Sequence, residues 1–207
     1  PMVIADLMTK WTWGLEMLQT KRRGFGNIVG HVKGVEDTSR LGEWTAQQLD
    51  PALDWKKIEE IKEMWDGPVI LKGILDPEDA VMAKKVGCDA IIVSNHGGRQ
   101  QDGALSSIRA LDPILQAVGG DLEVHLDSGI RSGQDVLKAV AMGAKGTYIG
   151  RAFVHGLGAQ GEAGVTKALE VIRNELDISM AFTGRRDIKD VTRDSILVPE
   201  GFSGTWA

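Results

Sequence analysis

Four short apolar segments, separated by stretches with helical spacing, constrain the fold of this chain more than any other feature. They cover residues 68–72, 90–93, 122–126 and 146–149. Most are rich in Val, Ile and Leu and too short for helices, which is typical of strands buried on both faces. Strands that alternate with helices predict a parallel sheet covered by helices, either a doubly wound sheet or a (β/α) barrel.

The stretches between these strands carry helix start and stop signals. Asp76 and Pro77 open one helix and Gly87 follows it, which are usual boundary residues. Ser132 and Asp135 form a pair like a capping box at the start of another helix. Further helices are expected over residues 2–20, 54–65 and 107–118, and along a stretch that includes 165–176 and ends near 184.

Polar residues follow every predicted strand, and this favours the barrel. They are Lys72, then residues 95–100, then residues 127–131, then Gly150 and Arg151. A barrel gathers the carboxyl ends of all its strands at one face, where its chemistry lies. We expect residues 1–207 to form a single domain, with a helix and loop flank over 1–50, β/α repeats over 51–184 and a C-terminal arm over 185–207.

Composition excludes several classes of protein. The net charge of −5 argues against a nucleic-acid-binding protein, which would usually carry a basic excess. The single cysteine, Cys88, excludes an internal disulfide and fits a reducing compartment. No apolar stretch approaches the length of a membrane span, about 20 residues. His31, His125 and His155 have no metal-ligand spacing, so we expect no metal site.

The loop after the second strand combines a proton acceptor with a group that can hold a carboxylate. His96 can take a proton near neutral pH. Arg99 can hold a carboxylate through two parallel hydrogen bonds. Gly97 and Gly98, between them, let the backbone turn sharply and approach a ligand. The loop therefore predicts a site for an acidic substrate, although on an isolated turn the same residues would have no role.

The loops after the third and fourth strands indicate a phosphate site. Each joins a strand to a helix N-terminus, where free N–H groups and the helix dipole favour an anion. Arg131 and Arg151 would add charge-assisted hydrogen bonds. The alternative is two capped helices with exposed arginines. Lys72 either stabilises negative charge on a ligand or points to water, and His125 is expected to pack in the core or the barrel lumen.

Three motifs together resemble those of the FMN-dependent L-2-hydroxy acid dehydrogenases and oxidases. They are SNHGGRQ at residues 94–100, DSGIRSG at 127–133 and Gly150-Arg151. The resemblance runs from about Asp54 to Ser195. The segment from Trp65 to Ala80 is most similar to the bacterial quinone-linked L-lactate dehydrogenases of this family.

The resemblance implies a role for each motif. His96 would be the catalytic base and Arg99 would bind the substrate. The residues that would bind FMN are Lys72, Ser94, Asp127, Ser128, Gly129, Arg131, Gly150 and Arg151. The implied activity is oxidation of a short L-2-hydroxy acid, with L-lactate favoured, to the 2-oxo acid, and transfer of the electrons to a quinone or cytochrome. The alternatives are an oxidase of the lactate, glycolate or mandelate type that uses O2, and a non-catalytic phosphate-binding half-barrel subunit.

The family fold has eight strands, and this chain supplies four that match the second half. We therefore expect an α/β fold that is the C-terminal half of a (β/α)8 TIM barrel, with the N-terminal half on another chain or segment. The resemblance to this family also implies a homotetramer. The expected location is the cytoplasm, with peripheral attachment to the inner face of the bacterial cell membrane as a further possibility.

Overall fold

The computed structural model describes residues 9, 11–20, 25–26, 28–29, 31–32, 41–48, 50 and 52–202. The chain divides into two compact units, Pro1–Leu53 and Asp54–Ala207. The described part of the first unit contains α2 (Trp11–Gln19) and α3 (Leu41–Gln48). Of the helix expected over residues 2–20, residues 2–8 and 10 lie outside the described residues. A single domain over residues 1–207 remains a prediction.

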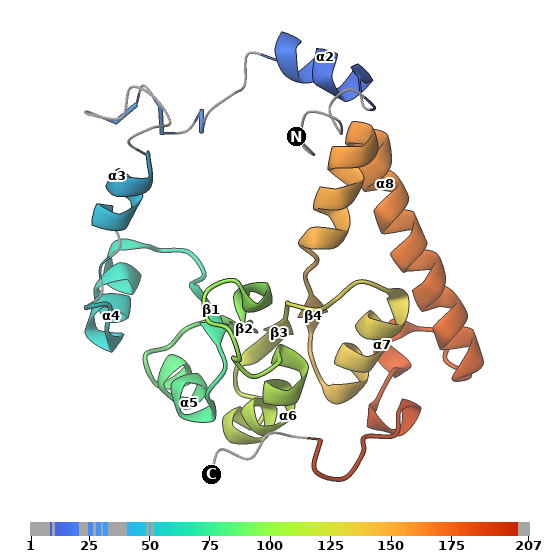
Figure 1. Cartoon of the computed structure of the whole chain (residues 1–207). Coiled ribbons are helices and arrows are strands. Elements are labelled where there is room, and N and C mark those ends of the chain that lie inside the picture. The colour runs from blue at the N-terminus through green and yellow to red at the C-terminus, as the bar shows by residue number, and fades with distance from the viewer. Residues whose placement is uncertain are drawn as a thin grey trace. The chain divides into compact units, whose positions relative to one another are not determined.

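The second unit is built on a four-stranded parallel sheet (Figure 1). Its strands are β1 (Ile70–Ile74), β2 (Ala90–Val93), β3 (Glu123–Leu126) and β4 (Gly146–Thr147). Each strand lies beside the next one in the sequence. This order is that of a barrel segment, whereas a doubly wound sheet reverses its order at a switch point. The prediction of four parallel strands is confirmed.

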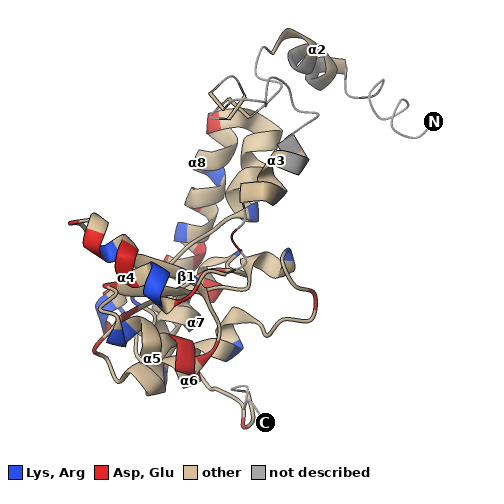
Figure 2. Cartoon of the chain, turned by 90° about the vertical axis from the view of Figure 1, so that its left-hand side faces the viewer, with Lys and Arg blue, Asp and Glu red and all other residues tan. Residues whose placement is uncertain are grey.

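Helices precede and follow each strand. They are α4 (Trp55–Met64), α5 (Pro77–Lys85), α6 (Ser107–Val118), α7 (Gly133–Met142) and α8 (Arg151–Phe182). The predicted caps at Asp76 and Ser132 form, since each side chain accepts a hydrogen bond from a first-turn N–H, and Asp54 caps α4 in the same way. α4 is rich in Lys and Glu and has no buried residue (Figure 2).

Two strands differ from their predicted bounds. β1 runs from Ile70 to Ile74 instead of residues 68–72, so Lys72 lies within the strand and not at its end. The register of β1 against β2 shifts between Lys72 and Ile74, because Gly73 adopts a left-handed φ of 101° and forms a bulge. β4 contains only two of the four predicted residues, although the Tyr148 N–H still donates to Leu126 O at 2.9 Å.

The hydrophobic core lies between the sheet and the helices that follow its strands. Ile91 and Val93 of β2 and Val124 and Leu126 of β3 are buried in it. Alternate residues of the same strands therefore lie on the opposite, inner face of the sheet. One inner-face row is formed by Lys72, Ile92, His125 and Gly146, which are aligned by the strand register.

α8 consists of two helical arms that meet at Gln160 and Gly161, whose φ and ψ are not helical. The arms fold back along one another (Figure 1). Gly156 and Gly164 allow this close approach, because a Cβ on Gly164 would lie 1.9 Å from Gly156 O. The close contact between the arms therefore depends on residues without side chains.

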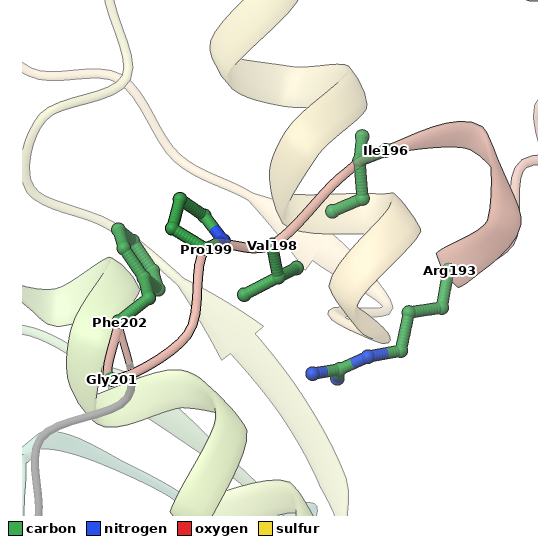
Figure 3. Close-up of a pocket in the computed structure, with 6 residues that line it drawn as sticks. All are labelled: Arg193, Ile196, Val198, Pro199, Gly201 and Phe202. Atoms are coloured by element: carbon green, nitrogen blue, oxygen red, sulfur yellow. The ribbon is translucent and has the colours of Figure 1, made fainter.

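The described part of the C-terminal arm, residues 185–202, is held against α6 of the same unit. The Arg193 guanidinium donates two hydrogen bonds to the buried Asp112 carboxylate, at 2.5 and 3.2 Å. The guanidinium of Arg109 lies over the Phe202 ring, 5.3 Å from its centre. The arm frames a hollow of about 470 Å³, in which Arg193 is the charged residue among apolar neighbours (Figure 3). Because Arg193 is already paired with Asp112, this hollow offers little chemistry.

Candidate functional site

Lys72 of β1 and the loops that follow β2, β3 and β4 line one cavity of about 270 Å³. Nine of the ten predicted site residues contribute to it, namely Lys72, His96, Arg99, Asp127, Ser128, Gly129, Arg131, Gly150 and Arg151. The tenth, Ser94, is buried and hydrogen-bonded to Lys72. The structure therefore brings together, at one edge of the sheet, side chains that are up to 79 positions apart in the sequence, from Lys72 to Arg151.

Lys72 and Asp127 form a charged pair within this cavity. Lys72 Nζ lies 2.9 Å from Asp127 Oδ2 and donates to Ser94 Oγ at 3.1 Å. Ser128 Oγ donates to Asp127 Oδ1 at 2.6 Å. Burial raises the pKa of Asp127, but hydrogen bonds from Ser128, Ser94 and Lys72 and the Lys72 charge outweigh it, so this pKa lies below its ordinary value. Lys72 is therefore directed into the site and not simply to water.

The loop that carries His96 is held in an unusual backbone conformation. His96, Gly97 and Gly98 all have positive φ, at 55°, 69° and 72°. Such a φ is unfavourable for His, so the surroundings must impose it. Ser94 Oγ accepts from the His96 N–H at 3.1 Å, and Asn95 Oδ1 accepts from the Gly97 N–H at 3.0 Å. These bonds hold the loop backbone from which the imidazole projects.

His96 and Arg99 lie on the same rim of the cavity. A Cβ on Gly73 would come within 3.0 Å of His96 Cε1, so the β1 glycine provides the space for the ring. Arg99 Nε donates to His96 O at 3.1 Å, and Arg99 is exposed. Arg151 Nη2 donates to Gly97 O at 2.9 Å and so ties the loop to the N-terminus of α8.

The sequence predicts that both helix N-termini beside the cavity offer free N–H groups to an anion, but the N-terminus of α7 does not. Asp135 Oδ2 accepts from the N–H groups of Arg131 and Ser132, each at 3.0 Å, so α7 closes its own N-terminus. α8 has no side-chain cap at Gly150, so its first-turn N–H groups lack acceptors within the helix. The open N-terminus of α8 is therefore the one suited to an anion.

Backbone and charge complete this end of the site. A Cβ at Gly129 or Gly150 would meet nothing within 4 Å, so both border open space. Arg131 and Arg151 line the same space. The combination of two guanidinium groups, glycine backbone and an open helix N-terminus suits a phosphate group.

Sequence reasoning missed two contributors. Ser107, at the start of α6, is buried, and its Oγ lies 2.6 and 2.8 Å from the carbonyl oxygens of Asp127 and Ser128. A serine at a helix start is a common capping signal, which concealed this contact. Tyr148 lines the cavity and is the only tyrosine in the sequence. The strand predicted over residues 146–149 included Tyr148, which concealed its place at the end of the shorter β4. His125 lies on the inner face of the sheet, as expected from its place in β3.

Comparisons with known proteins agree with this geometry. A family model described as FMN-dependent dehydrogenase matches residues 1–198. The L-lactate dehydrogenase of Pseudomonas aeruginosa (strain LESB58) is 48% identical over 202 residues, which are 95% of this chain and 52% of that protein. That of Actinobacillus pleuropneumoniae serotype 5b (strain L20) is 45% identical over 190 residues, 90% of this chain and 49% of that protein. The chain thus spans about half the length of the relatives it matches.

Solved structures show the same relation. The monotopic membrane protein (S)-mandelate dehydrogenase is similar with a TM-score of 0.85 and 31% identity, over 94% of this chain and 51% of that one. A mandelate oxidase variant with a monooxide FMN adduct gives a TM-score of 0.65 and 44% identity, over 67% and 44% of the two chains. The predicted fold class, half of an α/β barrel, is confirmed. No helix within the described residues is long and apolar enough to cross a bilayer.

Proposed function

The chain belongs to the family of FMN-dependent dehydrogenases, and from this premise we propose that it carries the site of an enzyme that oxidises a short L-2-hydroxy acid. L-lactate is the favoured substrate, because the relatives that are 45–48% identical are L-lactate dehydrogenases. The observation that carries the proposal is the single cavity that joins the His96 and Arg99 rim to Arg131 and Arg151.

The residues present fit FMN. Arg131, Arg151 and the open N-terminus of α8 match its doubly charged phosphate, and Gly129 and Gly150 leave room for the chain that carries it. The Lys72 ammonium provides positive charge further along the cavity. The volume of about 270 Å³ is slightly below the usual range for a ligand pocket, about 300–1,000 Å³, as expected if other strands complete the wall.

Within this site the protein binds the acid and takes its hydroxyl proton. Arg99 holds the substrate carboxylate through its planar guanidinium, which orients the hydroxyl toward His96. A ring nitrogen of His96 accepts the hydroxyl proton as the 2-oxo group forms. Bound FMN would accept the two electrons together with the hydrogen that leaves C2 of the substrate. The bulge at Gly73 and the hydrogen-bonded loop keep the imidazole in place for this step.

We propose a quinone or cytochrome as the final electron acceptor, because the matching relatives are named dehydrogenases. Mandelate oxidases are also among the similar structures, so an oxidase that uses O2 is the second candidate. After reduction with L-lactate under argon, reoxidation should be fast with a soluble quinone and slow in air. Reoxidation that is as fast in air would support the oxidase.

We propose that the other half of the barrel is supplied by a segment outside these 207 residues, and "the assembled enzyme" below means the two halves together. The described residues form four strands, and a closed barrel of this type has eight. The family resemblance supports a homotetramer of such barrels. The third candidate, a non-catalytic phosphate-binding half-barrel, would bind phosphate without any change in flavin colour.

We propose peripheral attachment to the cytoplasmic face of the membrane through the first unit. Trp11, Leu15 and Leu18 share one face of α2 and are 66%, 48% and 71% exposed. Residues 21–23 are Lys-Arg-Arg in the sequence, and residues 9–34 contain five basic residues and one acidic residue. Apolar helix faces beside basic residues bind anionic lipid surfaces. The protein should sediment with phosphatidylglycerol vesicles and not with phosphatidylcholine vesicles, and equal sedimentation would contradict this.

The central test is reduction of the flavin in the assembled enzyme. L-lactate added without oxygen should bleach the yellow colour. His96→Gln should retain FMN but lose about 10²–10⁴-fold in turnover, because an amide cannot accept the proton. His155→Gln, at an exposed position of α8, is the matched control. If the His96 variant keeps turnover within about threefold of the parent, a loss far smaller than this range, then His96 is not the base.

A further inference from the structure

A cluster on the inner face of the sheet has no part in the proposed chemistry so far. His125 Nε2 lies 2.7 Å from Glu123 Oε1 on the same strand. Because an ionised carboxylate only accepts hydrogen bonds, Nε2 carries a proton in this contact. The other ring nitrogen, Nδ1, is buried and has no hydrogen-bond partner among the described residues. The imidazole is therefore held in one orientation by Glu123.

Gly146 makes the space that the imidazole occupies. It pairs with His125 across the β3–β4 ladder. A Cβ on Gly146 would lie 2.7 Å from His125 Nδ1 and 3.0 Å from Cε1. The ring therefore lies over the glycine, in the volume that a side chain of β4 would otherwise fill.

Tyr148 lies two residues beyond Gly146 and so on the same face of the sheet. Its ring centre is 5.6 Å from that of His125, with the planes tilted by 35°. The Tyr148 side chain lines the cavity together with Lys72 and Arg151, and the residue is 42% exposed. The His125 ring thus packs against the Tyr148 ring, which forms part of the cavity wall.

We propose that Tyr148 is a cofactor-contacting residue of the FMN site and that His125, oriented by Glu123, positions its ring. This inference rests on the proposed function, because it assigns a further contact to the same cofactor. An aromatic ring on the wall of a cavity offers a flat apolar surface to a planar ligand. A tyrosine in contact with a flavin also quenches its fluorescence, which provides a readout independent of turnover.

The test compares FMN binding and flavin fluorescence in variants of the assembled enzyme. Tyr148→Leu should raise the Kd for FMN about two- to tenfold, the range that corresponds to one aromatic contact, and should raise the fluorescence of the bound flavin. His125→Leu should change both in the same direction by less. His125→Phe restores a ring over Gly146 and should return both values toward the parent. Glu123→Leu should behave like His125→Leu.

Phe202→Leu is the matched control, because it shortens an aromatic residue of the C-terminal arm outside the cavity. It should leave flavin fluorescence and the Kd for FMN unchanged. A Tyr148→Leu protein that binds FMN with unchanged Kd and fluorescence would overturn this inference alone. A parent enzyme that binds no FMN would overturn the proposed function, and the inference with it.

Discussion

His96 and Ser128 are the residues other than glycine that have positive φ within the described part of the chain, and both line the cavity. Such conformations cost of order 1–3 kcal/mol each. The Ser94 and Ser128 hydroxyl groups accept backbone N–H groups of His96 and Gly97, at 3.1 and 3.0 Å. At the residue scale, the strained loop is therefore stabilised by the same serines that surround Asp127.

The Asp127 charge should contribute stability that depends on pH. Its pKa in the folded state lies below the ordinary value of about 3.9, so the contribution is present above that pH and is lost as the pH falls through the folded-state pKa. Asp127→Asn should therefore destabilise the assembled enzyme at pH 7 and progressively less in acid. Thermal unfolding of both proteins between pH 7 and pH 3 checks this. A difference in melting temperature that stays constant over this range would contradict it.

Arg131 and Arg151 should act on the phosphate of the cofactor. Replacing both with Ala should weaken FMN binding at least tenfold, because each charge-assisted hydrogen bond contributes about 1.5–3 kcal/mol. Riboflavin lacks the phosphate, so its affinity should change less. Titration with the two flavins measures the difference, and Lys138→Ala with Arg173→Ala, at two exposed positions, is the control. Equal losses for FMN and riboflavin would argue against a phosphate site.

At the scale of elements, α7 and α8 start in similar sequence contexts but end up with different roles. Both follow a strand and a glycine-containing loop, with Arg131 in the loop before α7 and Arg151 as the first residue of α8. The Ser132–Asp135 capping box satisfies the N-terminus of α7, whereas α8 has no such pair. α8 also folds back on itself at Gln160 and Gly161. Its open N-terminus thus belongs to a helical hairpin packed on α7, and not to an isolated helix.

The contact between the two arms of α8 predicts opposite effects for two substitutions. Gly164→Ala places a Cβ 1.9 Å from Gly156 O and should cost about 1–3 kcal/mol of unfolding free energy. Gly158→Ala meets nothing within 4 Å and should stabilise the helix by about 0.5–1 kcal/mol. Urea unfolding of both variants measures these changes. Similar effects in the two variants would show that the arms do not pack in this way.

At the scale of the whole molecule, the sheet of the second unit has an outer face that is covered by helices and an inner face that is partly exposed. The outer face of the sheet is buried under α5, α6 and α7, whereas Ile70, Glu123 and Tyr148 on the inner face are exposed. Unpaired strand edges and an uncovered inner face favour association with other strands. We therefore expect the site to need more of the barrel around it than the described residues supply.

Residues 1–207 expressed alone should be poorly soluble and should not hold FMN. The charged groups at the phosphate end would act in a site open to water, where ion pairs contribute little. Addition of the other half of the barrel, in the same chain or as a second polypeptide, should restore the yellow colour. Size-exclusion chromatography with absorbance at flavin wavelengths measures both properties. A monodisperse, flavin-loaded 207-residue monomer would contradict the half-barrel interpretation.

The sequence by itself determined the features that depend on neighbouring residues. The caps at Asp76 and Ser132, the bounds of β2 and the strand–helix order all follow from local spacing and composition. Most cavity residues were predictable for the same reason, because the loops at His96, Asp127 and Gly150 follow their strands and parallel strands end at one edge.

Only the tertiary structure decided features that depend on contacts between distant segments. Lys72 lies inside β1 because the pairing with β2 shifts at Gly73. Ser107 reaches the loop at Asp127, 20 residues away, and the Arg193–Asp112 contact joins residues 81 positions apart. Strand register and burial depend on packing partners that no local pattern contains, so these contacts could not be predicted from the sequence of either segment.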